Sequence, residues 1–114
     1  MKFKLVMTIV NPDITESVIK SAKKSGATGE VIIPARGSGS NPAKFLGVQI
    51  VDKTEIILFV VEEHLVNNVL ESITSECKLS EPGNGIAVVL SVEKVAGLEK
   101  QIESIKTILK EENL

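Results

Sequence analysis

The chain contains no tryptophan or tyrosine, and its 114 residues include only three phenylalanines, one cysteine and one histidine. Without Trp and Tyr it lacks the usual platforms on which bases stack, and its net charge of -2 supplies no broad basic field, so we expect no nucleic-acid partner. Cys77 has no second cysteine with which to form an internal disulfide, which favours a reducing, cytoplasmic compartment. One Cys and one His also exclude a four-ligand Cys/His zinc site within a single chain.

The chain also lacks long apolar runs. None reaches the roughly 18 residues of a membrane span, so any membrane contact is expected only through a partner. The basic start of the chain is followed by a short apolar segment that is interrupted at Asn11-Pro12-Asp13, which predicts no secretory signal. With 43% hydrophobic and 25% charged residues, the composition is that of a folded globular chain. Residues 1–114 are therefore predicted to form a single domain around one core.

A strand followed by a helix is expected twice along the chain. Residues 4–10 form an apolar run of strand length, and Pro12 then suits a first helical turn with Asn11 as its N-cap. Apolar residues recur at helical spacing, with Lys24 on the solvent side, until Gly26, which can end the helix in a left-handed conformation. The β-branched stretch 30–35 is then predicted to be the second strand.

The second unit begins with the apolar run 55–61, which is typical of a buried strand. Glu62 and Glu63 place negative charge where the next helix begins, and that helix is expected to end before Pro82. Residues 86–92 are predicted to form the last strand of the sheet.

A hairpin is expected between the two units, in which residues 45–51 pair with 55–61 through the turn 52–54. The resulting order matches an α+β, ferredoxin-like split βαβ-βαβ sandwich, with two helices on one face of an antiparallel sheet. The strands are apolar on both faces, and few residues remain to cover the second face. We therefore expect the chain to pack against copies of itself as a homo-oligomer.

A further amphipathic helix is predicted over 98–112. Apolar Leu98, Ile102, Ile105 and Leu109 recur at three- and four-residue intervals with charged residues between them. This helix can dock on the domain as a terminal element, or it can bind a partner or gate a site.

Two glycine loops are candidates for binding a ligand: residues 36–39 leave one strand, and residues 81–85 enter another. Glycines let backbone N–H groups approach a ligand closely, which is how proteins cradle anions such as phosphate. The alternative is that both are tight turns whose glycines supply positive φ.

Catalytic residues are not predicted. Glu62, Glu63 and His64 are adjacent at a helix start, where such groups usually cap the helix and face solvent. No Ser/His/Asp or Cys/His set can be assembled from the sequence, and Glu16 and Glu55 are expected to be isolated surface carboxylates. The chain is therefore expected not to be an enzyme.

Taken together, these segments resemble the PII nitrogen-regulatory signalling proteins over nearly the whole chain. The motifs that carry the resemblance are 26–29, 36–39, and 83–85 followed by the strand 86–92. Residues 29–37 followed by 44–47 look most like a divergent PII-like branch with a short loop.

The resemblance implies a trimer of ferredoxin-like subunits with three intersubunit clefts that bind a small effector, an adenine nucleotide being the class implied. Residues 37–54 would be the T-loop, which docks on a regulated partner such as a transporter or an enzyme. Residues 80–85 would be the phosphate-holding B-loop, and 94–101 the C-loop region from a neighbouring subunit. The implied ligand-binding residues are Gly29, Arg36, Gly37, Ser38, Gly39, Gly83, Asn84, Gly85 and Lys94.

Several positions depart from the PII pattern. Ile86 stands where a phosphate-binding lysine is usual, and Gly97 and Glu99 stand where arginines are usual. Each lost cation removes a charge-assisted contact worth roughly 1.5 to 3 kcal/mol, which argues against tight triphosphate binding. A less charged ligand could still be held, with Arg36 or Lys94 as the remaining cations.

The T-loop-like segment departs as well. It contains no tyrosine to accept a uridylyl group, and Asn41 replaces the glutamine that helps hold magnesium and 2-oxoglutarate in classical members. Sensing of 2-oxoglutarate therefore does not carry over. Ser38 and Ser40 are explained by a Gly/Ser turn, with modification as the alternative.

The sequence leaves three functional hypotheses open. The first is a PII-like regulator whose T-loop-like segment responds to an effector bound in the cleft. The second is a scaffold-like trimer that binds no nucleotide, and the third is a metal-handling trimer like the related CutA proteins, with His64 or Cys77 contributed by three chains around an axis.

Overall fold

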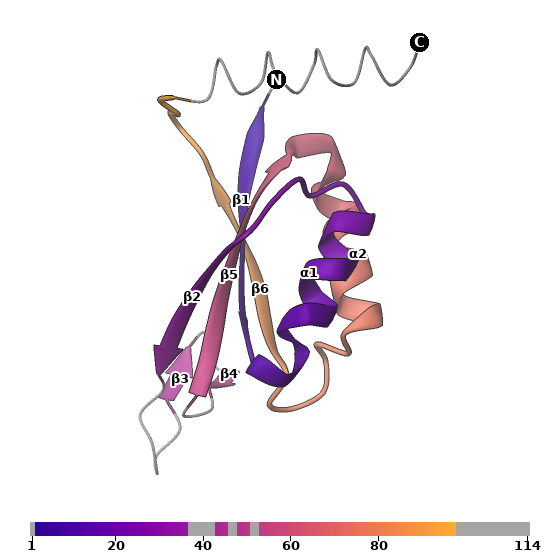
Figure 1. The fold of residues 1–114 in the computed structure, drawn as a ribbon, viewed down its shortest axis with the longest axis vertical. Helices are drawn as coiled ribbons and strands as arrows, with labels where there is room; N and C mark the ends of the chain where they lie inside the picture. Colours follow the sequence, from indigo (N-terminus) through magenta and orange to yellow (C-terminus); the bar gives the residue numbers. More distant parts are fainter. Residues whose placement is uncertain (1, 37–42, 46–47, 51–52, 98–114) are drawn as a thin grey trace.

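The computed structural model describes residues 2–36, 43–45, 48–50 and 53–97 of the chain. Figure 1 shows these elements along an elongated sheet. In chain order they are β1 (Phe3–Val10), the 3-10 turn η1 (Pro12–Ile14), α1 (Thr15–Lys24), β2 (Val31–Arg36), β3 (Ala43–Phe45), β4 (Val48–Ile50), β5 (Lys53–Glu62), η2 (Glu63–Leu65), α2 (Val66–Glu76) and β6 (Gly85–Ser91).

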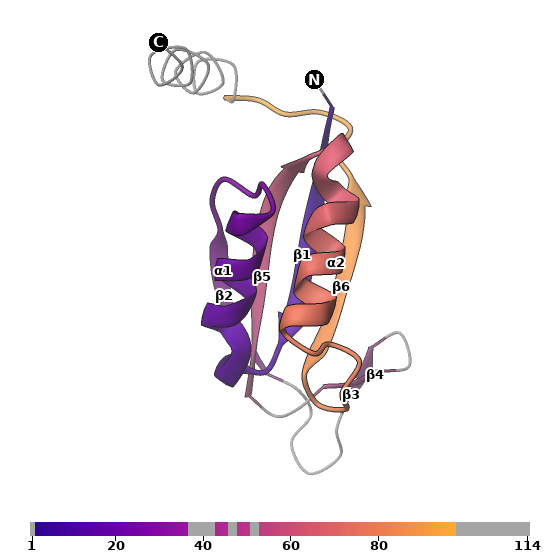
Figure 2. The same ribbon diagram turned by 90° about the vertical axis from the view of Figure 1, so that its right-hand side faces the viewer.

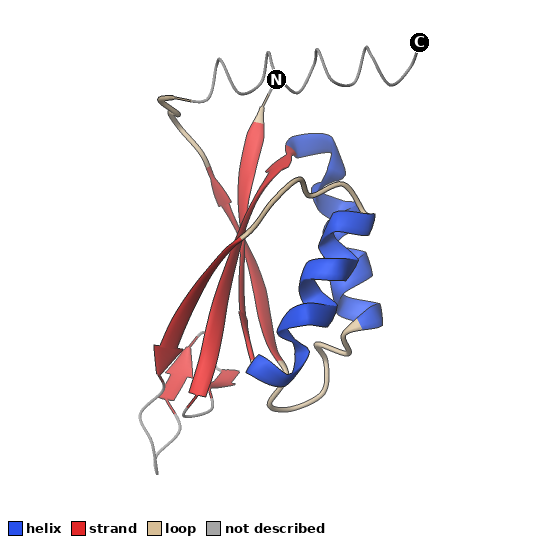
Figure 3. Ribbon diagram, in the orientation of Figure 1, coloured by secondary structure: helices blue, strands red, loops and turns tan. Residues whose placement is uncertain are grey.

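The main sheet has four antiparallel strands in the order β2-β5-β1-β6. Helices α1 and α2 lie next to each other on one face of this sheet, as Figures 2 and 3 show. This arrangement confirms the α+β, ferredoxin-like prediction. In the described part of the chain, neither helix is long and apolar enough to cross a membrane.

The core lies between the helices and the sheet. Because side chains alternate along a strand, every second residue in the middle of β1 and β5 points toward the helices and is buried. Phe59 is the largest of the fully buried side chains. The core residues contributed by these four elements are Val6, Val10, Val18, Ile19, Ala22, Ile57, Phe59, Val61, Val66, Val69 and Ile73.

The predicted start and end of the first helical segment are confirmed by hydrogen bonds. The Asn11 side chain caps η1 by accepting a hydrogen bond from the backbone N–H of Asp13 at 3.0 Å. Gly26 follows α1 with φ of 120°, and the N–H of Ala27 donates to the carbonyl of Ala22 at 3.0 Å. This closure is a Schellman motif, in which a residue with positive φ reverses the chain.

Helix α2 ends with the same motif, but without a glycine. Lys78 takes the left-handed conformation with φ of 53°, and the N–H of Leu79 donates to the carbonyl of Thr74 at 3.2 Å. Leu79 then packs against the core, which is the hydrophobic contact that usually accompanies this motif.

The predicted hairpin between 45–51 and 55–61 is wrong. β3 pairs with β4 instead, with Ala43 opposite Ile50, in a separate two-stranded sheet. β5 has no edge left for 45–51, because it pairs with β1 on one side and with β2 on the other.

The predicted helix over 98–112 lies outside the described residues, as do Gly37, Ser38, Gly39 and Asn41. The single-domain assignment of residues 1–114 stays a prediction for the same reason.

Candidate effector site

The predicted ligand-binding residues divide between the two ends of the sheet. Strand register places the end of β2, the start of β5, the end of β1 and the start of β6 together at one end, which is the lower end in Figure 1. Arg36 and the glycine turn, which we define as residues 83–85, lie at this end. Gly29 precedes β2 and Lys94 follows β6, so both lie at the opposite end.

The site is also divided across the width of the sheet. Arg36 belongs to β2 and the glycine turn leads into β6, and these are the two outer strands. Three interstrand spacings of about 4.8 Å place them roughly 14 Å apart. One subunit therefore does not bring the predicted residues into a single pocket.

Glycine is favoured at the two positions 83 and 85 of the turn for different physical reasons. Gly83 has φ of 86°, and a Cβ added there would meet nothing within 4 Å, so the backbone conformation alone favours glycine. Gly85 has φ of 133°, and an added Cβ would overlap the carbonyl oxygen of Ile9 and lie 2.8 Å from the Cα of Val10. Gly85 is thus required by the close approach of the turn to β1.

Asn84 holds the turn in place. Its side-chain Nδ2 donates to the carbonyl oxygens of Lys78 at 2.9 Å and Cys77 at 3.4 Å, at the end of α2. Its backbone N–H donates to Glu81 at 3.2 Å, and its carbonyl accepts from the N–H of Asn11 at 3.1 Å. The Nδ2, backbone N–H and carbonyl of Asn84 are therefore committed to contacts within the chain, which leaves the backbone amides of Gly83 and Gly85 as the groups of the turn that a ligand could meet.

A second cation, which the sequence pattern did not reveal, lies beside Arg36. Register pairs Arg36 with Lys53 directly across the β2–β5 ladder, and both residues are exposed. Neither side chain forms an ion pair with any residue that the structure describes. Like charges directly opposite one another repel, so an anion between them would be favourable. Only the strand pairing could have revealed this juxtaposition.

Gly29 and Lys94 lie on an open surface. A Cβ at Gly29 would meet nothing within 4 Å, and its φ lies outside the positive range, so no contact of the described chain requires glycine there. The neighbouring Glu30 is held by Lys23 in an ion pair of 3.1 Å. Lys94 is exposed beyond the end of β6.

Glu55 is not the isolated surface carboxylate that the sequence suggested. It is half-buried, and its Oε1 accepts a hydrogen bond of 2.6 Å from the hydroxyl of Thr15 at the start of α1. The neighbouring Thr54 is buried, and its hydroxyl donates to the carbonyl of Val10 at 2.7 Å. These contacts fasten the start of β5 to the end of β1 and to α1.

The residues of the metal hypothesis lie apart. His64 precedes α2 and contacts Glu62, with Nδ1 and Oε1 3.0 Å apart, whereas Cys77 follows α2 and is buried. Burial, and then the negative charge of Glu76, raise the pKa of the Cys77 thiol, which disfavours the thiolate that a metal needs. Within the described residues, no three His, Cys, Asp or Glu side chains come together in a metal-binding group.

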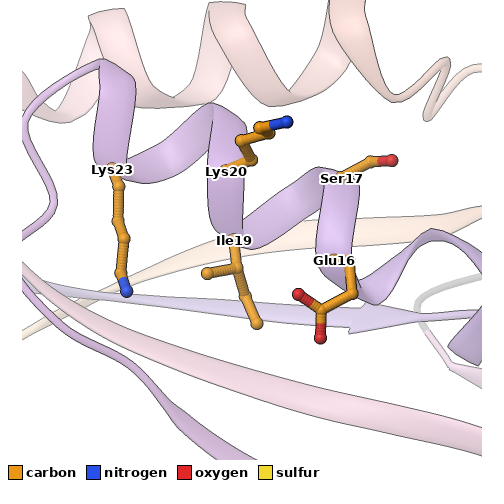
Figure 4. A pocket seen from close by; sticks show the side chains of 5 residues that line it. All are labelled: Glu16, Ser17, Ile19, Lys20 and Lys23. Carbon is orange, nitrogen blue, oxygen red and sulfur yellow. The ribbon is translucent and has the colours of Figure 1, made fainter.

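A shallow hollow along α1 is shown in Figure 4, lined by Glu16, Ser17, Ile19, Lys20 and Lys23. Three of these side chains, Glu16, Ile19 and Lys23, point to the same side of the helix. The hollow contains none of the predicted ligand-binding residues, and Lys23 is already paired with Glu30. It is therefore a feature of the helix surface rather than part of the candidate site.

Together, the sheet order, the two covering helices and the glycine turn before β6 define a ferredoxin-like α+β protein. Comparison with known families gives a match to the family "Nitrogen regulatory protein P-II" over residues 3–102, so the chain belongs to the PII family of regulatory proteins. Among solved structures it resembles a protein from Thermus thermophilus described as PII-like and signalling, with 24% identity and a TM-score of 0.62. That match covers 87% of this chain and 98% of the other, and at this identity it supports the fold alone.

Proposed function

We propose that this chain is a trimeric PII-like signalling protein that binds a small effector, an adenine nucleotide, in clefts between subunits. Binding changes residues 37–54, and this segment regulates a transporter or an enzyme in nitrogen metabolism. The protein would act in the cytoplasm and reach a membrane only through such a partner. Family membership supports the regulatory class, and the arrangement of the site supports the need for more than one subunit.

The observation that carries the proposal is the uncovered face of the sheet. Between Leu5 and Ile9, where β1 pairs with both β5 and β6, every position of the three strands on this face is apolar, and β2 adds two more. Four of these side chains are more than 40% exposed. An apolar face of this extent is expected to be buried by association. The residues that strand register places on this face are Leu5, Met7, Ile9, Val31, Ile33, Ile56, Leu58, Val60, Ile86, Val88 and Leu90, of which Ile9 is buried, at 8% exposure.

Copies of the chain would also complete the site. The glycine turn and Arg36 lie at one end but on opposite edges, and Lys94 lies at the other end. In a ring of identical subunits, one edge of each sheet meets the other edge of its neighbour, so groups about 14 Å apart within one subunit can face one cleft.

The charge of the site favours a small anion. The turn offers backbone amides, and Arg36, Lys53 and Lys94 are exposed cations. Because Ile86 replaces a cation that the PII pattern usually has, we expect AMP or ADP to bind more tightly than ATP.

A thermal-shift screen tests the proposal. The chain is heated with AMP, ADP, ATP, cyclic AMP or 2-oxoglutarate, and a bound ligand at 100 times its dissociation constant should add about 2.7 kcal/mol of stability. Lys94→Ala should reduce the shift, whereas Lys20→Ala, which removes an exposed cation from α1, should leave it unchanged. Amides of residues 43–45 and 48–50 should change their hydrogen exchange when the ligand binds. A flat screen, or equal exchange with and without ligand, would contradict the proposal.

The scaffold hypothesis remains the second candidate. One observation favours it. Contacts within the chain explain why asparagine stands at position 84 and glycine at position 85, so the presence of these residues does not require a bound ligand. A trimer with a flat nucleotide screen would favour this function over effector sensing.

A further inference from the structure

The end of β1 is held from both sides by the two segments on which the proposed function depends. On one side, Gly85 pairs with Val10, and the carbonyl of Asn84 accepts from the N–H of Asn11 at 3.1 Å. On the other side, the hydroxyl of Thr54 donates to the carbonyl of Val10 at 2.7 Å. The end of β1 is thus shared by the glycine turn and by the last residue of the segment 37–54.

The glycine turn cannot move independently of this strand end. The space that a Cβ at Gly85 would need is occupied by the Ile9 carbonyl and the Cα of Val10. The Asn84 side chain also ties the turn to the carbonyls of Cys77 and Lys78 at the end of α2. Close-packed groups of this kind transmit displacement rather than absorb it.

The start of β5 is also held to the end of β1, by a buried hydrogen bond. Thr54 is 6% exposed, and its hydroxyl has the Val10 carbonyl as its acceptor in a buried hydrogen bond. A second link joins the same region: Thr15, at the start of α1, donates to Glu55 at 2.6 Å. Helix α1 in turn follows the η1 turn that Asn11 caps. The start of β5 is therefore connected to the end of β1 in two ways: directly, through the hydrogen bond of Thr54 to Val10, and indirectly, from Asn11 through η1 and Thr15 to Glu55.

We propose that Thr54 is a positioning residue that couples the glycine turn to the start of β5. When the turn shifts, the Val10 carbonyl moves with it. Because this carbonyl accepts the buried hydrogen bond from Thr54, Thr54 is displaced as well, and Thr54 is the last residue of the segment 37–54. The regulatory meaning of this coupling rests on the proposed function, because it would connect an effector at the turn with the partner-binding segment. The coupling itself requires no ligand.

A double-mutant cycle tests the coupling in the ligand-free protein. Asn84→Ala loosens the turn, and Thr54→Val removes the hydroxyl while nearly keeping the side-chain shape. Asn84→Ala should speed hydrogen exchange of the Lys53 and Glu55 amides by roughly five- to tenfold in the otherwise unchanged chain. In the Thr54→Val background the same change should have little further effect, and the two effects on the folding equilibrium should be non-additive by at least about threefold.

Thr8 provides a matched control. It is also a buried threonine whose hydroxyl donates to a backbone carbonyl across the β1–β5 pair, that of Ile57 at 3.1 Å. Thr8→Val should therefore weaken folding to a similar degree as Thr54→Val. Because Thr8 lies in the middle of the sheet and shares no partner with Asn84, its effects should be additive with Asn84→Ala.

More conservative substitutions at positions 54 and 84 can be used if Thr54→Val or Asn84→Ala prevents folding. Thr54→Ser retains the hydroxyl and should restore the response of Lys53 and Glu55 to Asn84→Ala. Asn84→Ser removes the amide donors without adding a charge beside the carbonyls of Cys77 and Lys78, and it can replace Asn84→Ala in the cycle. Equal responses in the Thr54→Val and Thr8→Val backgrounds, or no response in the original chain, would overturn the coupling.

The result is separable from that of the nucleotide screen. A nucleotide-induced thermal shift combined with additive variants would retain the proposed function and overturn the role of Thr54. Non-additive variants combined with a flat nucleotide screen would support the role of Thr54 and count against effector binding.

Discussion

At the scale of single residues, the end of α1 could be predicted from the type of residue that ends it, whereas the end of α2 could not. Gly26 was predicted to end α1 because glycine tolerates positive φ, and it does so. Lys78 ends α2 in the same way, although lysine is a good helix former that gives no sign of a left-handed position. Leu79 packs against the core, and the chain must reverse direction at Lys78 for it to do so. This contact accounts for the left-handed conformation of Lys78.

Replacing Lys78 with glycine should stabilise the protein. The left-handed conformation costs a residue with a Cβ about 1 to 2 kcal/mol, and the extra freedom of glycine in the unfolded chain offsets part of the gain. We therefore expect Lys78→Gly to raise the free energy of unfolding by about 0.5 to 1 kcal/mol, measured by urea denaturation. Lys78→Ala keeps the Cβ and should give no such gain. Loss of stability in Lys78→Gly would contradict this account.

At the scale of elements, the contact between α1 and α2 depends on a small polar cluster. The Ser21 and Ser72 hydroxyl oxygens lie 2.8 Å apart, and Lys24 contacts Glu76 at 3.2 Å. A hydrogen bond from Ser21, followed by the interaction with Lys24, lowers the pKa of Glu76 below its ordinary value. Helical periodicity placed Lys24 on the solvent side of α1, but it gave no sign that α2 carries its partner.

Ser21→Ala should raise the pKa of Glu76 toward the ordinary value near 4.5, as followed by NMR titration of its side-chain carboxyl. A lowered folded-state pKa adds stability above the unfolded-state pKa, and this stability is lost as the pH falls through the folded-state value. Ser21→Ala should therefore weaken the acid dependence of this contact. Ser75→Ala removes a hydroxyl that donates to the backbone carbonyl of Glu71 instead, and it should leave the titration of Glu76 unchanged.

The strands show the limit of prediction at this scale. The existence and approximate bounds of the four strands of the main sheet were predicted from apolar runs, because strands that are apolar on both faces contain few polar interruptions. The partner of 45–51 was not predicted correctly, because several apolar stretches could compete for the edge of β5. Lys53 was missed as a neighbour of Arg36 for the same reason: register decides which side chains lie opposite.

At the scale of the whole molecule, the uncovered sheet face should control assembly. Leu58 lies in the middle of this face, between Met7 and Val31 on the neighbouring strands. Leu58→Glu should convert the proposed trimer to monomer, because a carboxylate buried in an apolar interface has no partner to replace its hydration. Light scattering at micromolar concentration measures this change.

Asn68→Glu provides the control for that experiment, since it adds the same charge on the exposed surface of α2. It should leave the mass unchanged. A monomeric parent chain, or a Leu58→Glu variant of unchanged mass, would contradict assembly through this face.

The sequence alone predicted the class of fold, the four strands of the main sheet, the two helices that cover it, and the glycine turn that leads into β6. These follow from local periodicity and from residues such as Pro12 and Gly26 whose backbone preferences are strong. Three features depend on tertiary packing: the pairing of the strands, the hydrogen bond of the Asn84 side chain to the end of α2, and the position of Arg36 and the glycine turn on opposite edges of the sheet. Tertiary packing also placed Thr54 against Val10, 44 positions away in the sequence. Local preferences carry no information about contacts between residues so far apart, because such contacts depend on how the whole chain packs.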